Sequence, residues 1–473
     1  MYKAYITTLT NVRKHPNADR LLLADCFGNT ICVSTDYYEG EIGIYFPTDG
    51  QLSVEFAEQN NLLRKKDDAG NNIGGYMDPD KRNVTAIRLR GEKSDGLFLP
   101  LSCLTYTGVD MDTLNVGDVI EGAINGHEIC CKYIPRRPDP SRAHTGGNKT
   151  RKHKVPTAPL FKEHADTEQL AYNLGAFKPG DEIEITLKMH GTSQRTGYLP
   201  VLKGYKKSFL DWLFRREGKP VYDWGYVSGT RRVVLENYEG GFYGDNIFRE
   251  QHSKIFEGKL WKGETVYYEV VGFTTSGAPI MSSANNSKLQ DKEFIKQYGK
   301  ETVFSYGCEP EASTTWKLDE DGNDMTLVGR TKQSDIYVYR MTMTNEDGEV
   351  VEYTPDFMRY RCEQMAVKTV PVFGKALISE DRLHFVAPNG YDHDYLIGTG
   401  TIGDLVMKAA EEFYDGPDPV GKTHVREGVV VRIINRPKFA AYKIKNFSFK
   451  CLEGLVKVEA EAPDMEEAQE VVE

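Results

Sequence analysis

Short apolar runs separated by turn residues dominate the first 125 residues of the chain. The runs NTICVST, IGIYFP and NVTAIRLRG are divided by Gly, Asn and Asp, which favour turns. Strands of this length and spacing are typical of a small closed β-barrel. The pattern therefore predicts an all-β domain over residues 1–125.

The pattern changes at residues 126–158, which hold several prolines and glycines and almost no apolar residues. This composition predicts a linker or an exposed loop. Residues 132–154 contain eight Lys or Arg and one acid, Asp139. The segment is either a basic strip that binds phosphates or a solvated connector, and the sequence leaves both interpretations open.

A mixed α/β pattern covers residues 159–458, where ITLKMH, TVYYEVVGF, DIYVYRM, EGVVVRI and FAAYKIKNF are strand-like. The segment DLVMKAAEEFYD predicts a helix with Leu405, Ala409 and Phe413 on one face and Asp404 as the N-cap. Residues 459–473 are acidic and carry no strand pattern, so we expect a separate tail.

Composition narrows the class of protein. The chain has 473 residues, 27% of them charged, and a net charge of -11. It contains no apolar run long enough to span a membrane and no signal-peptide pattern at its start. Eight cysteines form no CxxC pair, which favours free thiols. We therefore expect a cytoplasmic, monomeric globular protein that does not bind membranes.

The segment with the most chemical content is EIEITLKMHGTSQRTG, residues 182–197. Ile183, Ile185 and Leu187 alternate with polar residues, so Lys188 would end a half-buried strand on its polar face. Gly191 would then permit a tight turn. A lysine there could attack a nucleotide α-phosphate, but only as the free amine, which burial or nearby cations would have to favour. Without further motifs, an exposed strand-end lysine is the simpler interpretation.

Five further segments follow Lys188 in order: SGTRRVVLE, YYEVVGF, DIYVYRM, REGVVVRI and AYKIKNF. Together with KMHGTS, this series resembles the nucleotidyltransferase motifs of covalent ligases and capping enzymes. The segments FKEHADTEQL, GFTTSGAPIM and FSYGC are similar to those of the fifth family of ATP-dependent RNA ligases. In the first domain, HPNADRLLLADCFGN and RLRGEKSDGLFLPLS resemble oligonucleotide-binding (OB) barrels.

The resemblance implies an α+β fold. An N-terminal OB-fold β-barrel would precede a mixed α/β, ATP-grasp-like nucleotidyltransferase domain with antiparallel sheets. It also implies that ATP, Mg²⁺ or Mn²⁺, and RNA or a nicked RNA-containing duplex bind to the chain. Lys188 would carry AMP as a covalent intermediate, and AMP would pass to an RNA 5′-phosphate before a 3′-OH seals the strand.

The same resemblance implies roles for individual residues, each with a plainer alternative. Lys443 and Lys445 share one strand face and would contact the α-phosphate, unless they form an exposed basic strand. Glu427 would assist catalysis and bind metal through water, or be an ordinary strand-end carboxylate. Glu269 would contact the ribose or the hydrated metal.

Nucleotide contacts are implied for further positions: Leu187, His190, Gly191, Arg231, Arg232, Tyr337 and Tyr339. One of the two arginines would hold the ribose or an RNA phosphate, although both could be surface charges. One of the two tyrosines would stack on adenine, although either could belong to the core. His190 departs from the family pattern, in which many members have aspartate, so a direct carboxylate–metal contact is not expected from that position.

A second lysine pattern, GPDPVGKT at residues 416–423, matches the P-loop formula. We reject it because a P-loop follows a strand and opens a helix, whereas the sequence here predicts a helix before and a strand after. Pro417 and Pro419 also lack the N–H groups that would bind phosphate.

Two alternatives to an RNA ligase remain from the sequence. A capping guanylyltransferase or a DNA ligase uses the same lysine chemistry, but such enzymes usually carry a barrel after the last lysine motif. The printed sequence ends too soon after Lys445 to include one. A non-catalytic RNA-binding protein built on the N-terminal barrel is the other alternative.

Overall fold

The computed structural model divides the chain into two compact units. Unit 1 comprises Met1–Arg136, Ala284–Glu301 and Phe447–Glu461, and unit 2 comprises Arg137–Ser283, Thr302–Asn446 and Ala462–Glu473. Within them the structure describes residues 2–66, 72–133, 155–164, 167–209, 218–238, 246–275, 280–281, 292–298, 315–318, 325–328, 334–421 and 425–459. Most of the expected linker, the FSYGC segment and nearly all of the acidic tail lie outside these residues.

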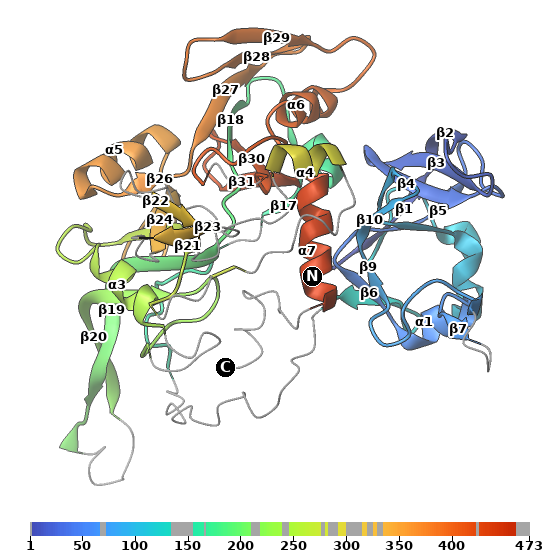
Figure 1. Cartoon of the computed structure of the whole chain (residues 1–473). Coiled ribbons are helices and arrows are strands. Elements are labelled where there is room, and N and C mark those ends of the chain that lie inside the picture. The colour runs from blue at the N-terminus through green and yellow to red at the C-terminus, as the bar shows by residue number, and fades with distance from the viewer. Residues whose placement is uncertain are drawn as a thin grey trace. The chain divides into compact units, whose positions relative to one another are not determined.

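Unit 1 is built from small antiparallel sheets (Figure 1). The four-stranded sheet has the order β12 (Leu97–Pro100), β5 (Ile42–Phe46), β1 (Ala4–Thr8), β13 (Val119–Ile120). Two three-stranded sheets are β2 (Thr10–Lys14), β3 (Leu21–Cys26), β4 (Asn29–Ser34) and β16 (Cys130–Lys132), β6 (Gly50–Leu52), β9 (Asn83–Val84). Three two-stranded pairs are β7 (Lys65–Lys66) with β8 (Asn72–Gly74), β10 (Ala86–Leu89) with β11 (Glu92–Asp95), and β14 (Ala123–Ile124) with β15 (His127–Glu128).

The helices of unit 1 are short. They are α1 (Val54–Gln59), α4 (Lys292–Tyr298), α7 (Phe447–Glu459) and the 3₁₀ turns η1 (Leu101–Thr107) and η2 (Met111–Thr113). A core that includes Ile6, Ile44 and Phe56 joins the strands to α1 and η1. The β-rich prediction is thus correct, but the sheets of the described residues are separate rather than one closed barrel.

Unit 2 contains two larger sheets. The seven-stranded sheet has the order β17 (Glu168–Gln169), β31 (Ala440–Lys445), β30 (Gly428–Ile433), β18 (Glu182–Leu187), β27 (Val372–Ile378), β28 (Arg382–Val386), β29 (Asp392–Leu396). The six-stranded sheet comprises β20 (Lys219–Gly229), β19 (Thr192–Lys206), β21 (Glu264–Gly272), β24 (Ser334–Thr344), β25 (Val350–Glu352), with β26 (Lys368–Thr369) beside β24. A separate pair is β22 (Thr315–Leu318) with β23 (Met325–Val328).

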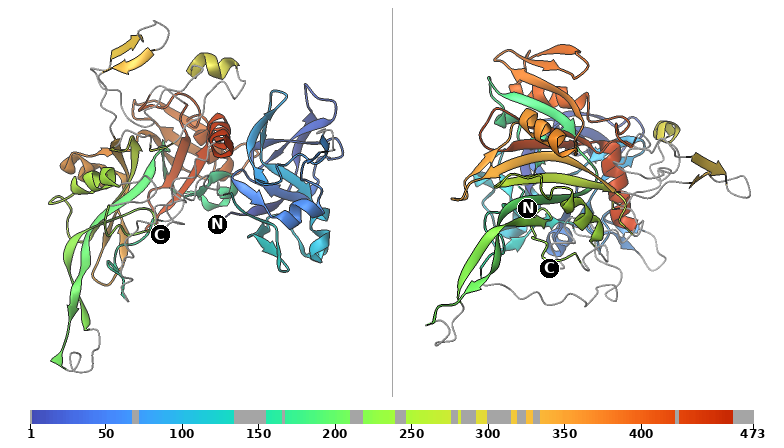
Figure 2. Two further views of the ribbon diagram at one scale, coloured as in Figure 1. Left: turned by 60° about the horizontal axis from the view of Figure 1, so that its bottom comes forward. Right: turned by 90° about the vertical axis from the view of Figure 1, so that its left-hand side faces the viewer.

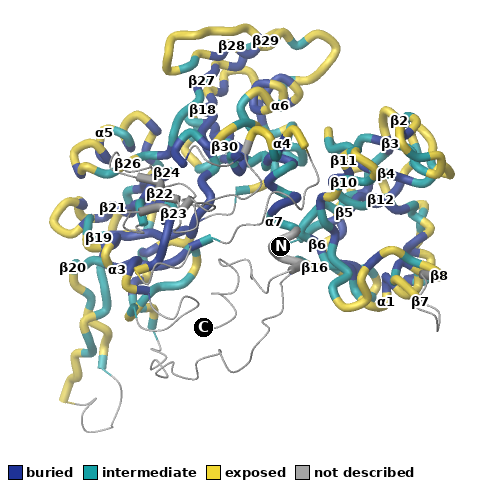
Figure 3. Tube along the Cα trace, in the orientation of Figure 1, coloured by how far each residue is buried: buried dark blue, intermediate teal, exposed yellow. Residues whose placement is uncertain are grey.

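Helices cover these two sheets. They are α3 (Ile247–Lys254), α5 (Pro355–Met365), α6 (Ile402–Glu411) and the 3₁₀ turns η4 (Leu170–Tyr172) and η5 (Leu174–Ala176). Leu405 and Ala409 of α6 pack into the core of the seven-stranded sheet, whereas Phe248 of α3 and Met358 of α5 pack into that of the six-stranded sheet. Figure 3 shows the buried strands beneath these exposed helical faces. The mixed α+β prediction, with mainly antiparallel sheets, is therefore correct.

Two local predictions need correction. Strand β18 is not half-buried, because its polar residues Glu184 and Thr186 are buried together with its apolar residues. Glu184 instead pairs with Arg359 of α5 at 2.7 Å. The N-cap of α6 is Thr401, and Asp404 occupies the third helical position, where its carboxylate accepts the Thr401 N–H in a capping box.

Seven of the eight cysteines lie among the described residues, and all seven are free thiols, as expected. No helix in the described ranges is long and apolar enough to cross a membrane.

A buried ion pair fastens α5 to β21. Glu264 is fully buried, and Arg361 donates to both of its carboxylate oxygens at 2.9 and 2.8 Å. Tyr353 and the Trp261 backbone donate to the same carboxylate. Four donors thus satisfy one buried anion.

Replacing Glu264 with Ala should lower the free energy of unfolding by about 3–5 kcal/mol, because it leaves the Arg361 guanidinium buried without its counter-charge. Urea titration measures this loss. The exposed Glu257→Ala serves as the control and should shift stability by about 0.5 kcal/mol or less. A Glu264→Ala variant as stable as this control would contradict the role assigned to the pair.

Candidate active site

The lysine motif carries the chain from one sheet of unit 2 to the other. Strand β18 ends at Leu187 in the seven-stranded sheet, and β19 begins at Thr192 in the six-stranded sheet. The four residues between them are 188–191. Leu187 and Met189 are buried in one cluster with Tyr337 of β24. The crossing is therefore anchored on both sides of Lys188.

A buried carboxylate gathers the side chains of the site. Oε1 of Glu427 lies 2.6 Å from Nζ of Lys188 and 3.4 Å from Nζ of Lys445, and Oε2 lies 3.1 Å from Nδ1 of His190. Glu427 is 3% exposed, so these partners replace water around the charge. Three of the residues expected at the site thus meet around a fourth.

Strand register explains this meeting. Val429 of β30 pairs with Leu187 of β18, and Gly428 pairs with Lys445 of β31. The residue before β30 therefore falls between the ends of its two neighbours. Gly428 has a φ of 150°, and a Cβ there would lie 2.0 Å from the Ile444 carbonyl oxygen. Only glycine fits this close approach of β30 to β31. Gly428 is therefore needed directly after Glu427 for the carboxylate to keep its position.

Charge controls the ionisation of Glu427. Burial by itself would raise the pKa of this carboxyl, but the positive charges of Lys188 and Lys445 and the hydrogen bond with His190 hold it well below its usual range. Glu427 is consequently an anion in the folded protein.

The chain bends at Gly191, and the absence of a side chain there also has a packing role. A Cβ at this position would lie 2.4 Å from the Val270 carbonyl oxygen and 2.8 Å from Cγ of Glu269. The glycine therefore permits close approach of the crossing segment to β21.

The nucleotide-binding candidates on the second sheet lie in one row. Ser193 pairs with Glu269, and Glu269 pairs with Tyr337, so these residues of β19, β21 and β24 share a sheet face. Tyr339 is partly buried, and its hydroxyl lies 2.9 Å from Oγ of Ser193. Tyr337 is 2% exposed and belongs to the core, so Tyr339 is the more accessible of the two.

Lys443 precedes Lys445 by two positions on β31, and period-two geometry places both on one face. Tyr442 and Ile444 pack against the core of the seven-stranded sheet, as predicted for the opposite face.

The two candidate arginines lie after β20, where Arg231 is partly buried and Arg232 is exposed. Sequence reasoning missed the residue that holds them. Arg195 is 1% exposed and donates to the backbone carbonyls of Thr230 and Arg232 at 2.9 and 3.2 Å. Its guanidinium also donates to the Phe161 carbonyl at 3.1 Å.

A second missed arginine, Arg249 of α3, is fully buried and donates to the Ser193 carbonyl and the Thr192 hydroxyl at 3.1 and 2.7 Å. It thus fixes the start of β19 beside the crossing segment. Nothing in the local pattern of either arginine indicated burial, because arginine is usually exposed and these partners are distant in sequence.

The P-loop formula does not correspond to a P-loop. Its described residues follow α6 and precede β30, in the expected order. The Asp418 carboxylate accepts the backbone N–H groups of Val420 and Gly421, both at 2.8 Å, so these donors are already used within the turn. Lys422 and Thr423 lie outside the described residues.

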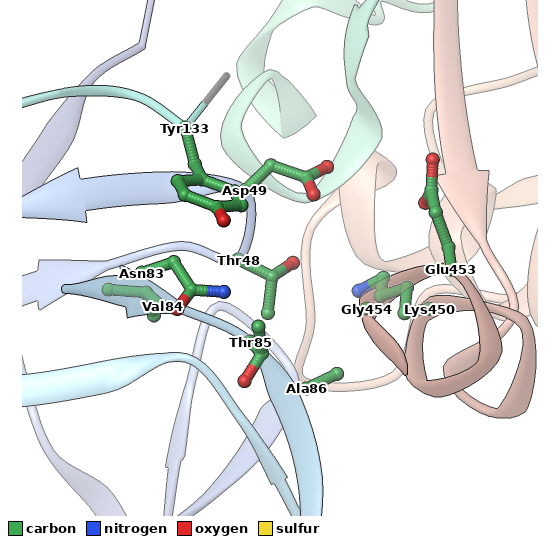
Figure 4. A pocket seen from close by; sticks show the side chains of 10 residues that line it. All are labelled: Thr48, Asp49, Asn83, Val84, Thr85, Ala86, Tyr133, Lys450, Glu453 and Gly454. Atoms are coloured by element: carbon green, nitrogen blue, oxygen red, sulfur yellow. The ribbon is translucent and has the colours of Figure 1, made fainter. Parts of the chain in front are cut away.

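No group of three or more His, Cys, Asp or Glu within the described ranges is placed to hold a metal ion. A small pocket lies in unit 1 and is lined by Asp49, Asn83 and Tyr133 together with Lys450 and Glu453 of α7 (Figure 4). Its volume of about 10 Å³ accommodates roughly one water molecule, too little for a nucleotide.

The chain has the fold of an RNA ligase. Three solved structures that share it over nearly the whole chain are of the RNA ligase of Naegleria gruberi. A mutant with AMP and Mn has a TM-score of 0.52 and 15% identity, covering 94% of this chain and 97% of that one. A mutant with ATP and Mn has a TM-score of 0.51 and 16% identity, covering 94% and 98%. An apo mutant has a TM-score of 0.52 and 16% identity, covering 94% and 97%.

Neither a protein-family model nor a curated protein sequence matches the chain.

The depressed pKa of Glu427 makes a prediction about stability. Because the folded-state pKa lies below the ordinary glutamate value of about 4.5, the ion cluster stabilises the fold above about pH 4.5. This contribution is lost as pH falls through the lower folded-state pKa. Glu427→Gln should therefore have a lower Tm than the parent chain at pH 7, and the difference should shrink below pH 4.5.

Thermal unfolding of both proteins between pH 7 and pH 3 measures this difference. A Tm gap that stays constant over the whole range would contradict the assignment.

Proposed function

We propose that the chain is an ATP-dependent RNA ligase that joins RNA 5′-phosphate and 3′-OH ends, as at a nick, through a lysyl-AMP intermediate on Lys188. The observation that supports this most is the 2.6 Å contact of Lys188 with Glu427, which Lys445 and His190 also approach. A phosphoryl group bound here would be surrounded by the amine of Lys188, the ammonium group of Lys445 and the ring of His190. The carboxylate of Glu427 would hold these groups in place. The RNA ligase fold supports the same assignment.

Glu427 orients Lys188 and is a poor acceptor of its proton. The low pKa of the carboxyl disfavours its protonated form, so the ion pair is a resting arrangement in which the carboxylate stabilises the ammonium group. Lys445 contacts the same oxygen. When Lys188 turns toward phosphate as a free amine, Lys445 and His190 keep Glu427 paired.

Three displacements complete the reaction. Nζ of Lys188 loses a proton and attacks the α-phosphorus of ATP, forming an N–P bond as the bond to pyrophosphate breaks. An RNA 5′-phosphate oxygen then attacks the same phosphorus, which breaks the N–P bond and transfers AMP. Finally an RNA 3′-OH loses its proton and attacks the RNA 5′-phosphorus, forming the phosphodiester and releasing AMP.

Residues around Lys188 have complementary roles in this scheme. Lys443 and Lys445 offset negative charge on the phosphoryl oxygens. Tyr339 stacks on adenine, since it is more accessible than the buried Tyr337. Leu187, His190 and Gly191 shape the floor of the nucleotide site beside the crossing segment. One of Arg231 and Arg232 holds the ribose or an RNA phosphate, and Arg195 maintains their backbone position.

Mg²⁺ or Mn²⁺ fits the site only through water. Both oxygens of Glu427 already have cationic or ring-nitrogen partners, and the position of His190 supplies no carboxylate. Glu427 and Glu269 would therefore hold a hydrated ion, which supplies charge neutralisation at the phosphates.

Unit 1 serves as the RNA-binding part. Its short antiparallel strands form separate sheets rather than one closed barrel, so they support a partly open OB-fold in residues 1–125, with residues 126–158 as the linker and 159–458 as the adenylyltransferase domain. An OB-fold binds single strands through stacking and backbone contacts.

The decisive measurement is covalent labelling with α-labelled ATP and magnesium or manganese. The parent chain should form an acid-labile protein–AMP adduct, Lys188→Ala should form none, and chelation of the metal should prevent labelling. Lys422→Ala is the matched control, because it removes the lysine of the rejected P-loop and should leave labelling intact. An adduct in Lys188→Ala, or none in the parent chain, would disprove the mechanism.

Two extensions of this assay define the function further. Labelling with GTP instead of ATP would indicate a capping-type enzyme. Sealing rates on nicked duplexes with RNA or DNA on each side of the nick would define which strands the enzyme accepts. A protein that binds RNA but never forms the adduct would instead be a non-catalytic RNA-binding protein.

A further inference from the structure

Strands β19 and β20 continue as a two-stranded arm beyond the rest of their sheet. Strand β21 pairs with β19 only from Thr192 to Gly197, whereas β20 pairs with it as far as Lys206. Among the described residues, the outer part therefore has a single strand pair and no third strand. Both further views show it extending away from the six-stranded sheet (Figure 2). An isolated hairpin is marginally stable in water, so the fold of unit 2 does not by itself account for this extension.

The inner part of the arm has support from aromatic side chains. The rings of Tyr198 and Tyr226 stack at 4.7 Å, and the ring of Trp224 lies 5.8 Å from that of Tyr198. Nζ of Lys262 lies 5.2 Å from the Trp224 ring. These contacts stabilise the inner part of the arm, beyond which its outer residues extend.

The outer residues are basic although the whole chain is acidic, with a net charge of -11. Lys203, Lys206, Lys207 and Lys219 are all exposed. Over residues 198–209 and 218–229, the described part of the arm, Asp223 is the single acid. A local excess of positive charge therefore lies on the exposed outer part of the arm.

Two of these lysines oppose one another. The register pairs Lys206 directly with Lys219 across the strands. Like charges at directly opposed positions destabilise a strand pair, whereas opposite charges stabilise it. An acidic residue at either position would strengthen the arm, so the fold gains nothing from this pair. A polyanion that lies along the arm would turn the same pair into a favourable feature.

We propose that this arm binds the sugar–phosphate backbone of the RNA that the chain ligates, with Lys206 and Lys219 as its central phosphate contacts. The inference rests on the proposed function, because the ligase reaction supplies the RNA. Each lysine that neutralises a phosphate releases a condensed counterion, so binding through the arm depends on salt and not on sequence. Lys203 and Lys207 extend the contact along the backbone.

The test compares two double charge reversals. Lys206→Glu/Lys219→Glu keeps like charges opposed and so preserves the balance within the arm, while it reverses the sign that RNA meets. Lys178→Glu/Lys408→Glu makes the same change in net charge at exposed positions beside the seven-stranded sheet. Binding of a nicked RNA duplex is measured for both and for the parent chain at several KCl concentrations.

The arm variant should bind on the order of tenfold more weakly near 0.1 M salt, and its slope of log affinity against log salt should be smaller in magnitude by about 1.8, as expected for two lost phosphate contacts on a duplex. The control should retain the parent slope. An arm variant with the parent affinity and slope, or an equal loss in the control, would overturn the proposal.

A single Lys206→Glu variant separates binding from stability. It creates an opposite-charge pair with Lys219, so amide hydrogen exchange in the outer arm should slow while RNA affinity falls. If affinity does not fall although the arm is stabilised, the proposal is wrong.

Protein–AMP labelling distinguishes this proposal from the proposed function. The arm variants should label with ATP like the parent chain, because the arm lies outside the lysine site. A parent chain that never labels but binds RNA through the arm would refute the ligase and leave the arm assignment standing.

Discussion

The arrangement of the candidate site depends on one buried anion, the carboxylate of Glu427. Its 3% exposure means that protein groups must replace the solvation of a full negative charge. Lys445 does so from the end of β31, and Lys188 and His190 do so from the crossing segment. The carboxylate also stabilises the two lysines, because Lys188 and Lys445 would repel each other in the absence of its negative charge. The pairing therefore orders Lys188, the proposed nucleophile, in the protein without a bound nucleotide.

The two sheets of unit 2 provide the frame for this interaction. The register of β18, β30 and β31 brings the three strand ends together, and Gly428 allows the close strand approach that a Cβ would prevent. On the other sheet, Gly191 permits the crossing segment to approach β21. Buried Arg195 and Arg249 then tie loops and strand starts to this frame through backbone carbonyls. The secondary structure thus fixes the backbone of the site. In the proposed reaction only the end of the Lys188 side chain has to turn from Glu427 toward the phosphate.

The lysine side chains discussed above lie in two different environments. Near Glu427 they are largely buried and paired, which suits a reaction at a single phosphoryl group. On the β19–β20 arm they are exposed and oppose one another, which suits a long polyanion whose contacts must form and break. The overall charge of -11 conceals both groups, because a net charge does not describe how charge is distributed.

The sequence by itself determined the elements whose patterns are local. Strand-like runs predicted β21, β24, β30 and β31, and a helical period predicted α6. A preceding helix and a following strand excluded the P-loop at Lys422. Motif order also indicated Lys188, Glu427 and Lys445 as one set. Only the tertiary structure decided that β18 is buried on both faces, that Gly191 serves close approach, and that Arg195 and Arg249 lie inside unit 2. Each of these depends on partners distant in the chain, and periodicity within one strand carries no information about which strand will lie beside it.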